Sequence, residues 1–475
     1  MIEVGRNNII VRNVDPESRE YKTAQMRYSL YDKVTHKYTF HAFYQYGNDL
    51  YFPSSIGLEE IRRVFPSKAV SVDYTKTAKA KPLEYTMLHA PRDELQEKAI
   101  AFLLRVRKDP ETHQRFLSLE TGKGKTYVTI NAISKLKKRA MIIVDTLDLA
   151  DQWKREFLNH TNLAAQDIVI LSGQESIDKQ MALPTGKVYI AIHRTLSNLI
   201  SNDMTSIGKL MGKLGIGIRI FDESHVEYMN ICRINSLSNV EYTIYLTATP
   251  SRSAYQDDSL YAKVFRRIPY FNGKELGSEK YCKVIMCKMN SHPGLDDRIA
   301  ARTKYGFNQA KWASYVANDG YEFLLEALVK LFDSFKLISR DKKVAIMLPT
   351  IELIKKIKDD LTNQYPGIEI GTFIGEISKD KRLEELSKKF ILTNDKIFDK
   401  GIDVKDLEIL ILMVPISSAV KTEQIVGRLR DRKDYSSIVI DVTDIGFDEC
   451  VRQSKLRKRF YKKRAKEIIE IKNIL

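Results

Sequence analysis

Short runs of almost uninterrupted apolar residues, separated by segments of helix length, recur in two stretches of this chain. The first stretch, from Leu83 to about residue 250, contains 141–144 and 188–192. The second contains 344–348, 409–414 and 438–440. Such runs are typical of parallel strands that helices bury on both faces. The sequence therefore predicts an α/β fold with two similar parallel-sheet lobes.

The first 82 residues follow a different pattern and predict a small α+β domain. Apolar and aromatic residues alternate from Tyr38 to Tyr46, a turn signal follows at 47–49, and 50–52 resume a strand, which indicates a hairpin. Leu58, Ile61 and Phe65 have helical spacing. We expect an N-terminal domain at 1–82, a first lobe at 83–255, a second lobe at 256–451 with an inserted helical segment, and a basic C-terminal helix at 452–475.

Two groups of aromatic residues allow more than one interpretation. The stripe from Tyr38 to Tyr46 could stack on nucleic-acid bases, but such a stripe is more often the packed face of a small sheet. Trp312, Tyr315 and the amphipathic stretch 321–335 could form a wedge, and we favour a core role for them. Neither group is therefore assigned to a binding site.

A glycine-rich loop precedes the first helix-length segment of the first lobe. It reads Thr121-Gly122-Lys123-Gly124-Lys125-Thr126. Two glycines let backbone N–H groups approach phosphate oxygens at a helix N-terminus, Lys125 would reach the terminal phosphates, and the Thr126 hydroxyl would bind Mg²⁺. Leu119 stands where the full pattern has glycine, so a lysine-rich surface turn remains an alternative for this segment alone.

An acidic box supports the phosphate interpretation. Asp222-Glu223-Ser224-His225 directly follows the apolar run 217–221. Asp222 is a candidate second Mg²⁺ ligand, because that cation prefers oxygen, and Glu223 can polarise the attacking water. Paired with the glycine-rich loop, the box predicts hydrolysis of a nucleoside triphosphate, with ATP and Mg²⁺ as cofactors.

Three later motifs add features that a simple nucleotide binder lacks. Thr247-Ala248-Thr249 follows an apolar run, Gly401-Ile402-Asp403 lies in the second lobe, and Gln424-Ile425-Val426-Gly427-Arg428-Leu429-Arg430 comes soon after. An arginine offered to the γ-phosphate can increase the rate about 10³–10⁵-fold. We expect Arg428 to have that role.

In order and spacing, these segments resemble motifs I, II, III, V and VI of superfamily-two helicases. The resemblance implies that Gln96, with Arg92, contacts adenine, that Gln424 and Arg428 act in catalysis, and that Gly401, Asp403 and Arg430 contact the nucleotide. The family usually has a second arginine where Asp431 stands, so Arg430 or Arg432 could replace it.

The family's strand-contacting motifs resemble two further segments. They lie at 146–153 and around 193–195, so Thr146, Arg194 and Thr195 are expected to touch nucleic acid. His225, Thr247 and Thr249 would couple the ATP site to that strand. Within the family, the Asp222-Glu223-Ser224-His225 box, the segment Gln152-Trp153-Lys154 and a compact basic N-terminal domain are most similar to phage branch-migration helicases of the UvsW type.

The charge of the chain favours a polyanionic partner. The formal net charge is +16, and residues 452–475 contribute ten Lys or Arg against two Glu, which is +8. Lys458 and Arg459 in this tail, and Arg62 and Arg63 near the N-terminus, are candidate DNA contacts. A merely solvated helix face is the alternative for the tail.

Cysteine content and hydropathy exclude other classes of protein. Four cysteines without paired spacing predict neither zinc nor disulfides. The first residues form no apolar signal segment, and no run approaches the ~20 apolar residues of a membrane span. We expect a cytoplasmic, monomeric protein.

The predicted function is an ATP-dependent DNA helicase or translocase that remodels branched or forked DNA, as the resemblance implies. An ATPase that unwinds RNA or releases transcripts is the alternative within the enzyme class. A nucleic-acid-binding scaffold switched by nucleotide is the alternative from another class.

Overall fold

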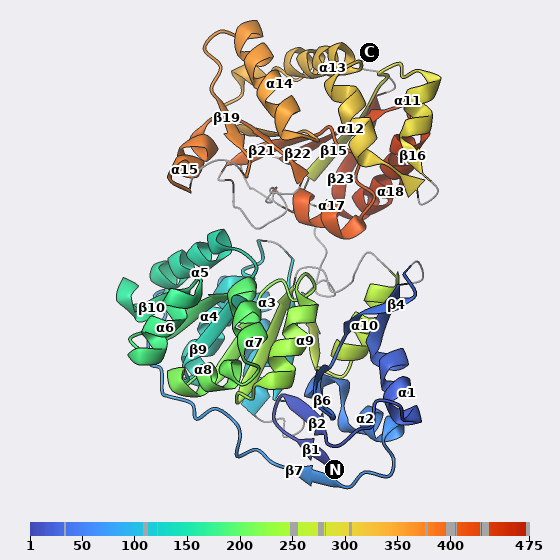
Figure 1. Cartoon of the computed structure of the whole chain (residues 1–475). Coiled ribbons are helices and arrows are strands. Elements are labelled where there is room, and N and C mark those ends of the chain that lie inside the picture. The colour runs from blue at the N-terminus through green and yellow to red at the C-terminus, as the bar shows by residue number, and fades with distance from the viewer. Residues whose placement is uncertain are drawn as a thin grey trace. The chain divides into compact units, whose positions relative to one another are not determined.

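The computed structural model divides the chain into two compact units, Met1–Gly277 and Ser278–Leu475 (Figure 1). It describes residues 1–32, 35–107, 113–120, 122–247, 255–273, 280, 282–303, 306–375, 379–395, 404, 406–427, 429 and 437–471. Among these residues, no helix is both long and apolar enough to cross a membrane.

The N-terminal segment forms a small α+β domain, as predicted. Its elements are β1 (Ile2–Val4), β2 (Asn8–Val11), α1 (Arg19–Tyr28), β3 (Ser29–Asp32), β4 (Lys37–His41), β5 (Tyr44–Tyr46), β6 (Asp49–Pro53), α2 (Leu58–Val64) and β7 (Val70–Val72). A mixed sheet has the order β5-β6-β2-β1-β7, and β3 pairs separately with β4. The predicted hairpin is confirmed, with Gly47 at φ +56° in the turn between β5 and β6.

The aromatic stripe is divided between two sheets. The chain turns away at Ala42 and Phe43, both of which are buried, so β4 and β5 are not one strand. Phe40 packs edge-to-face on Tyr228, whereas Tyr38 and Tyr46 are exposed. The packed interpretation therefore holds for the middle of the stripe and fails at its two ends.

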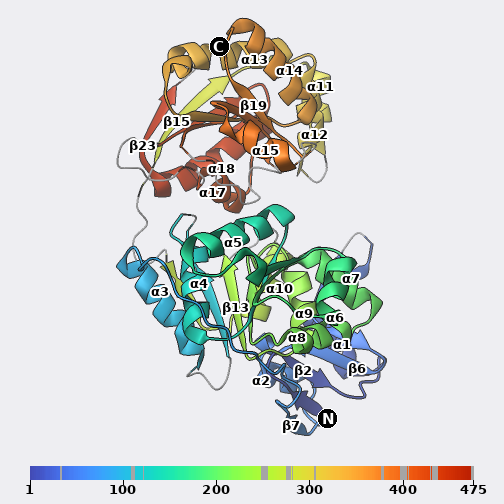
Figure 2. The same cartoon turned by 90° about the vertical axis from the view of Figure 1, so that its left-hand side faces the viewer.

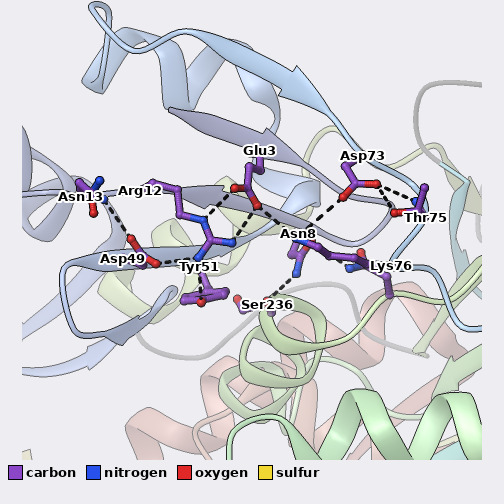
Figure 3. Close-up of polar contacts among 11 residues, drawn as sticks. Glu3, Asn8, Arg12, Asn13, Asp49, Tyr51, Asp73, Thr75, Lys76 and Ser236 are labelled. Atoms are coloured by element: carbon purple, nitrogen blue, oxygen red, sulfur yellow. Dashed lines mark hydrogen bonds and ion pairs between the residues drawn. The ribbon is translucent and has the colours of Figure 1, made fainter.

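Polar contacts join the N-terminal domain to the rest of the first unit. Within the domain, Arg12 lies between the carboxylates of Glu3 and Asp49 (Figure 3). Across to α9, the Asn8 amide donates to the Ser236 carbonyl at 2.9 Å. The Asn7 amide donates to the Thr243 hydroxyl at 2.9 Å. Because the two asparagine bonds are buried, the domain packs as part of the first unit rather than on a separate linker.

The rest of the first unit contains a parallel sheet covered by helices. Its elements are α3 (Glu94–Leu104), β8 (Gln114–Ser118), α4 (Lys125–Leu136), β9 (Ala140–Val144), α5 (Leu147–His160), β10 (Ile168–Leu171), α6 (Gln174–Ala182), β11 (Val188–Ile192), α7 (His193–Asn202), α8 (Ser206–Leu214), β12 (Ile218–Phe221), α9 (Tyr228–Leu237), β13 (Tyr242–Thr247), α10 (Tyr255–Phe265) and β14 (Tyr270–Asn272). The strand order is β10-β11-β9-β12-β13-β8-β14. Since β14 pairs with β8, this lobe continues past the predicted boundary at 255.

Alternating side chains supply two separate cores. In β9, Ile142 and Val144 pack with α3, α4 and α5, whereas Met141 and Ile143 pack with α7, α8 and α9. Figure 2 shows α3 and α4 on one side of β13 and α9 and α10 on the other. Ile218 and Ile220 of β12 belong to the α3–α5 core, so Asp222, two residues further on, lies on that same side.

The second unit repeats this architecture. Its elements are β15 (Cys282–Met289), α11 (Leu295–Ala300), β16 (Arg302–Thr303), β17 (Gly306–Phe307), α12 (Gln309–Ala317), α13 (Tyr321–Ser334), β18 (Lys343–Met347), α14 (Ile351–Gln364), β19 (Ile370–Phe373), α15 (Lys379–Ser387), β20 (Phe390–Thr393), β21 (Leu407–Leu412), α17 (Ala419–Val426), β22 (Ser437–Asp444), α18 (Asp448–Arg464) and β23 (Ala465–Ile471). The parallel order is β19-β20-β18-β21-β22-β15-β23. The two predicted parallel-sheet lobes are thus confirmed, and they have the tandem RecA-like arrangement that the resemblance to superfamily-two helicases implies.

The helical segment that contains Trp312, Tyr315 and the stretch 321–335 belongs to the core of the second unit. Trp312 and Tyr315 of α12 are buried, as are Tyr321, Leu324 and Leu328 of α13. All of them contribute to one hydrophobic cluster with β15 and β18. The core interpretation is therefore confirmed.

The prediction of a helix across residues 452–475 is wrong in its second half. The helix α18 ends at Arg464, and β23 then pairs in parallel with β15 at the sheet edge. The run from Ala465 to Ile471 is rich in isoleucine, whose branched side chain suits a strand. The basic residues of the tail are therefore divided between a helix and an edge strand.

Candidate active site

The glycine-rich loop leads into α4 with the geometry of a phosphate cradle. Gly122 and Gly124 have φ of +82° and +84°, a region that L side chains avoid. Gly124 caps α4, and Lys125 and Thr126 are its first residues. The N–H groups at this helix N-terminus suit an anion.

Gln96 lies beneath this loop. It is 4% exposed, its carbonyl accepts from the Arg92 N–H at 2.9 Å, and its amide donates to the Lys123 carbonyl at 3.3 Å. A Cβ on Gly124 would lie 2.2 Å from the Gln96 Nε2 atom. Gln96 thus supports the loop directly, while contact between adenine and Gln96 or Arg92 stays a prediction.

Replacement of Gly124 by alanine should weaken ATP binding about tenfold. The left-handed conformation costs an L residue about 1–2 kcal/mol, and a tenfold loss corresponds to about 1.4 kcal/mol. The new Cβ must also displace Gln96. Gly212→Ala is the matched control, because no atom lies within 4 Å of a Cβ there. Titration with labelled ATP measures both variants, and equal affinities would contradict the cradle.

Lys125 brings the loop and the acidic box together. Its Nζ atom lies 3.1 Å from Asp222 Oδ1 and 2.5 Å from Glu223 Oε1. Burial lowers the pKa of Lys125, but the charges of Asp222 and Glu223 outweigh burial and raise this pKa above its usual value. The ammonium is therefore charged and can exchange these carboxylates for phosphate oxygens.

The acidic box continues from β12 with an unusual backbone. Glu223 has φ +43°, and its N–H donates to Asp222 Oδ1 at 2.9 Å. His225 Nδ1 lies 2.8 Å from the Thr247 hydroxyl and 3.4 Å from Glu223 Oε2. The structure thus brings two predicted coupling residues, His225 and Thr247, into contact beside the candidate base.

Trp153 is the residue of this site that the sequence did not reveal. Its indole N–H donates to Asp222 Oδ2 at 2.8 Å, and the side chain is only 2% exposed. The resemblance grouped Trp153 with strand-contacting residues. The spacing of Ala150, Trp153 and Phe157 on the buried face of α5 was the available signal that it points inward.

The residues present could hold Mg²⁺. Thr126 offers a hydroxyl at the start of α4, and Asp222 offers a carboxylate 3.1 Å from the Lys125 ammonium. Oxygen ligands of this kind are those that Mg²⁺ prefers. The donor set therefore fits the cation that the sequence predicted.

The residues predicted to contact nucleic acid differ in burial and in hydrogen bonding. Thr146 caps α5 by accepting from the Leu149 N–H, and Thr195 is buried and accepts from the Gly173 N–H at 3.0 Å. Arg194, Arg62, Arg63 and Arg459 are exposed, and Lys458 pairs with Glu470. The two threonines thus have structural roles, and contact of any of these residues with DNA stays a prediction.

Several predicted residues fall outside the part of the chain that the structure describes. These are Thr121, Thr249, Gly401, Asp403, Arg428 and Arg430. Gln424 is half-buried in α17 of the second unit. The glycine-rich loop and the acidic box both belong to the first unit.

Residues 90–252 match the family model of the res subunit of type III restriction enzymes. This match covers about a third of the chain and shows what these residues are similar to. Proteins named as helicases or translocases are among those to which the chain is similar. Together with the site geometry, these similarities support an ATP-dependent enzyme.

Three relatives show how far this similarity extends. A putative ATP-dependent RNA helicase of Acanthamoeba polyphaga mimivirus is 23% identical, over 73% of this chain and 63% of that protein. The DNA 3'-5' translocase XPB2 of Sulfurisphaera tokodaii is 22% identical, over 69% of this chain and 77% of that one. A transcript termination protein of Yaba-like disease virus is 25% identical, over 66% and 64%. The chain thus spans less than two thirds of the length of the two viral relatives.

A solved structure shares the fold. Dbp5 of S. cerevisiae, bound to RNA and ADP BeF3, matches with a TM-score of 0.55 at 13% identity, over 80% of this chain and 89% of that one. T4 UvsW aligns over both full chains at 14% identity, with a TM-score of 0.36. The value for UvsW is too low to assign the chain to that branch of helicases.

Proposed function

We propose that the chain hydrolyses ATP with Mg²⁺ and uses the reaction to move along DNA. The observation that supports this most strongly is the contact of Lys125, at the head of α4, with both Asp222 and Glu223. The glycine-rich loop and its lysine suit a phosphate. The two carboxylates beside that lysine suit a cation and an attacking water at the same place.

Each residue has a distinct part in this reaction. The backbone N–H groups after Gly122 bind the phosphates, and Lys125 moves from the carboxylates to the terminal phosphate oxygens. Thr126 and Asp222 would hold Mg²⁺, which neutralises phosphate charge when it is bound. Glu223 accepts a proton from the attacking water, and its contact with His225 relays the state of the site to Thr247.

The preferred substrate in this proposal is branched or forked DNA, as for UvsW-type helicases. The Asp-Glu-Ser-His box, the Gln-Trp-Lys segment at 152–154 and the basic N-terminal domain support this narrower choice. Phosphate contacts carry no sequence information, so the structure of the DNA rather than its sequence would select the substrate.

RNA is the second candidate substrate. Two relatives are named as an RNA helicase and a transcript termination protein. The same helicase core would serve RNA, and contacts to the 2′-hydroxyl would distinguish the two.

Measurement of ATP turnover on different nucleic acids tests these choices. The purified protein is supplied with duplex DNA, forked DNA, a synthetic four-way junction, single-stranded DNA or RNA. We expect the junction and the fork to stimulate turnover most. Stimulation by RNA alone would favour the second candidate, and turnover unaffected by every nucleic acid would favour the scaffold. The Glu223→Gln protein controls for contaminating ATPases.

A further inference from the structure

The two oxygens of the Asp222 carboxylate have different surroundings. Oδ1 lies 3.1 Å from Lys125 Nζ and accepts from the Glu223 N–H at 2.9 Å. Oδ2 accepts from the Trp153 indole at 2.8 Å. Asp222 is 7% exposed and Trp153 is 2% exposed, so water contributes little to either oxygen.

The indole can act only as an anchor. It is a donor without a lone pair for a metal, and its ring has two rotatable side-chain bonds. The ring packs against Phe157 one turn further along α5, with centroids 6.3 Å apart, and Thr146 caps the start of the same helix. Trp153 therefore holds Oδ2 from a rigid helix and leaves Oδ1 on the side of the loop.

We propose that Trp153 is a positioning residue that fixes the Asp222 carboxylate so that Oδ1 is presented to Mg²⁺. The inference rests on the magnesium site proposed above. Outer hydrogen-bond partners of this kind orient ligands, and their loss typically costs about 10–100-fold in metal affinity or activity.

The chain contains a matched control for this tryptophan. Trp312, the other of its two tryptophans, also donates to a buried carboxylate, Asp444 Oδ2, at 3.3 Å. Trp312 lies in α12 of the second unit, and its partner Asp444 is not one of the residues proposed to hold Mg²⁺. Trp153→Phe and Trp312→Phe thus remove the same kind of bond at two places.

The experiment measures binding without turnover. Dye-labelled ADP is titrated with Mg²⁺ on the full chain, and fluorescence anisotropy gives the half-saturating Mg²⁺ concentration. We expect Trp153→Phe to raise this concentration about 10–100-fold, with unchanged ADP affinity in EDTA, and Trp312→Phe to leave it unchanged. An unchanged value for Trp153→Phe overturns the proposal. A wild-type protein that needs no Mg²⁺ overturns the magnesium site itself.

Two further measurements separate positioning from folding. In an Asp222→Asn background, Trp153→Phe should cause no additional shift, because the bond acts through that carboxylate. In the Trp312→Phe protein, Trp153 is the sole tryptophan, and its emission should change at the same Mg²⁺ concentration that drives ADP binding. The proposal is contradicted if Trp153 emission does not change with Mg²⁺. It is also contradicted if Trp153→Phe raises the half-saturating Mg²⁺ concentration as much in the Asp222→Asn background as in the wild type. The emission measurement holds even if Trp153→Phe folds poorly.

Discussion

Replacement of Glu223 by glutamine should reduce ATP turnover about 10²–10⁴-fold, the usual contribution of a positioned acid or base. The amide keeps the size of the side chain and an oxygen that can accept from Lys125, which lies 2.5 Å from Glu223 Oε1. It cannot accept a proton from water. The affinity for ATP should change little, because Lys125 and the glycine-rich loop remain.

Steady-state turnover and equilibrium binding of labelled ATP check this result. Glu227→Gln is the control, since Glu227 lies four residues further along and accepts from Asn230 at 2.6 Å. It should retain wild-type turnover. If Glu223→Gln also retained wild-type turnover, another group would be the base. If it lost ATP binding instead, the residue would support the pocket rather than the reaction.

Replacement of Arg457 by alanine should destabilise the second unit by about 3–5 kcal/mol, the usual cost of removing one partner of a buried ion pair. Arg457 binds Asp441 through two hydrogen bonds of 2.8 and 2.7 Å, and both side chains are almost fully buried. Its third donor group bonds the Ile416 carbonyl at 3.1 Å. Truncation would leave the Asp441 carboxylate buried with the Tyr461 hydroxyl at 2.8 Å as its remaining partner in this cluster.

Denaturant unfolding followed by Trp312 fluorescence measures this effect, with Trp153 replaced by phenylalanine so that only the second unit reports. Arg459→Ala removes an equal charge from an exposed site on the same helix and should change stability by no more than about 0.5 kcal/mol. Equal stabilities of the two variants would contradict a structural role for Arg457. The double variant Asp441→Leu with Arg457→Met should recover much of the loss, because no uncompensated charge remains.

Much of the fold could be predicted from the sequence because burial repeats with a regular period. The runs at 141–144 and 344–348 are central strands in the structure. The loop and the acidic box could also be predicted. Each is contiguous in the sequence and follows the carboxyl end of a parallel strand, which is where ligands bind in such sheets. Because the carboxyl ends of parallel strands lie on the same side of the sheet, Lys125 of the loop contacts Asp222 of the acidic box.

In the tail, residues 452–475, the local sequence pattern did not predict the secondary structure correctly. A run of lysines, arginines and isoleucines is compatible with either a helix or a strand. In the structure, residues 465–471 form a strand because they pair with β15 at the edge of the second sheet. Charge alone also could not separate Arg457, buried on Asp441, from the exposed Arg459 two residues later.

The amino-acid sequence predicts two parallel-sheet lobes, a phosphate loop and an acidic box, because each depends on residues that are neighbours along the chain. Three further features emerge from the folded structure: Trp153 bonds Asp222, Gln96 lies against Gly124, and Asn7 and Asn8 join the N-terminal domain to the first lobe. These contacts join residues 28 to 236 positions apart, and such pairs become neighbours only when packing brings separate elements together.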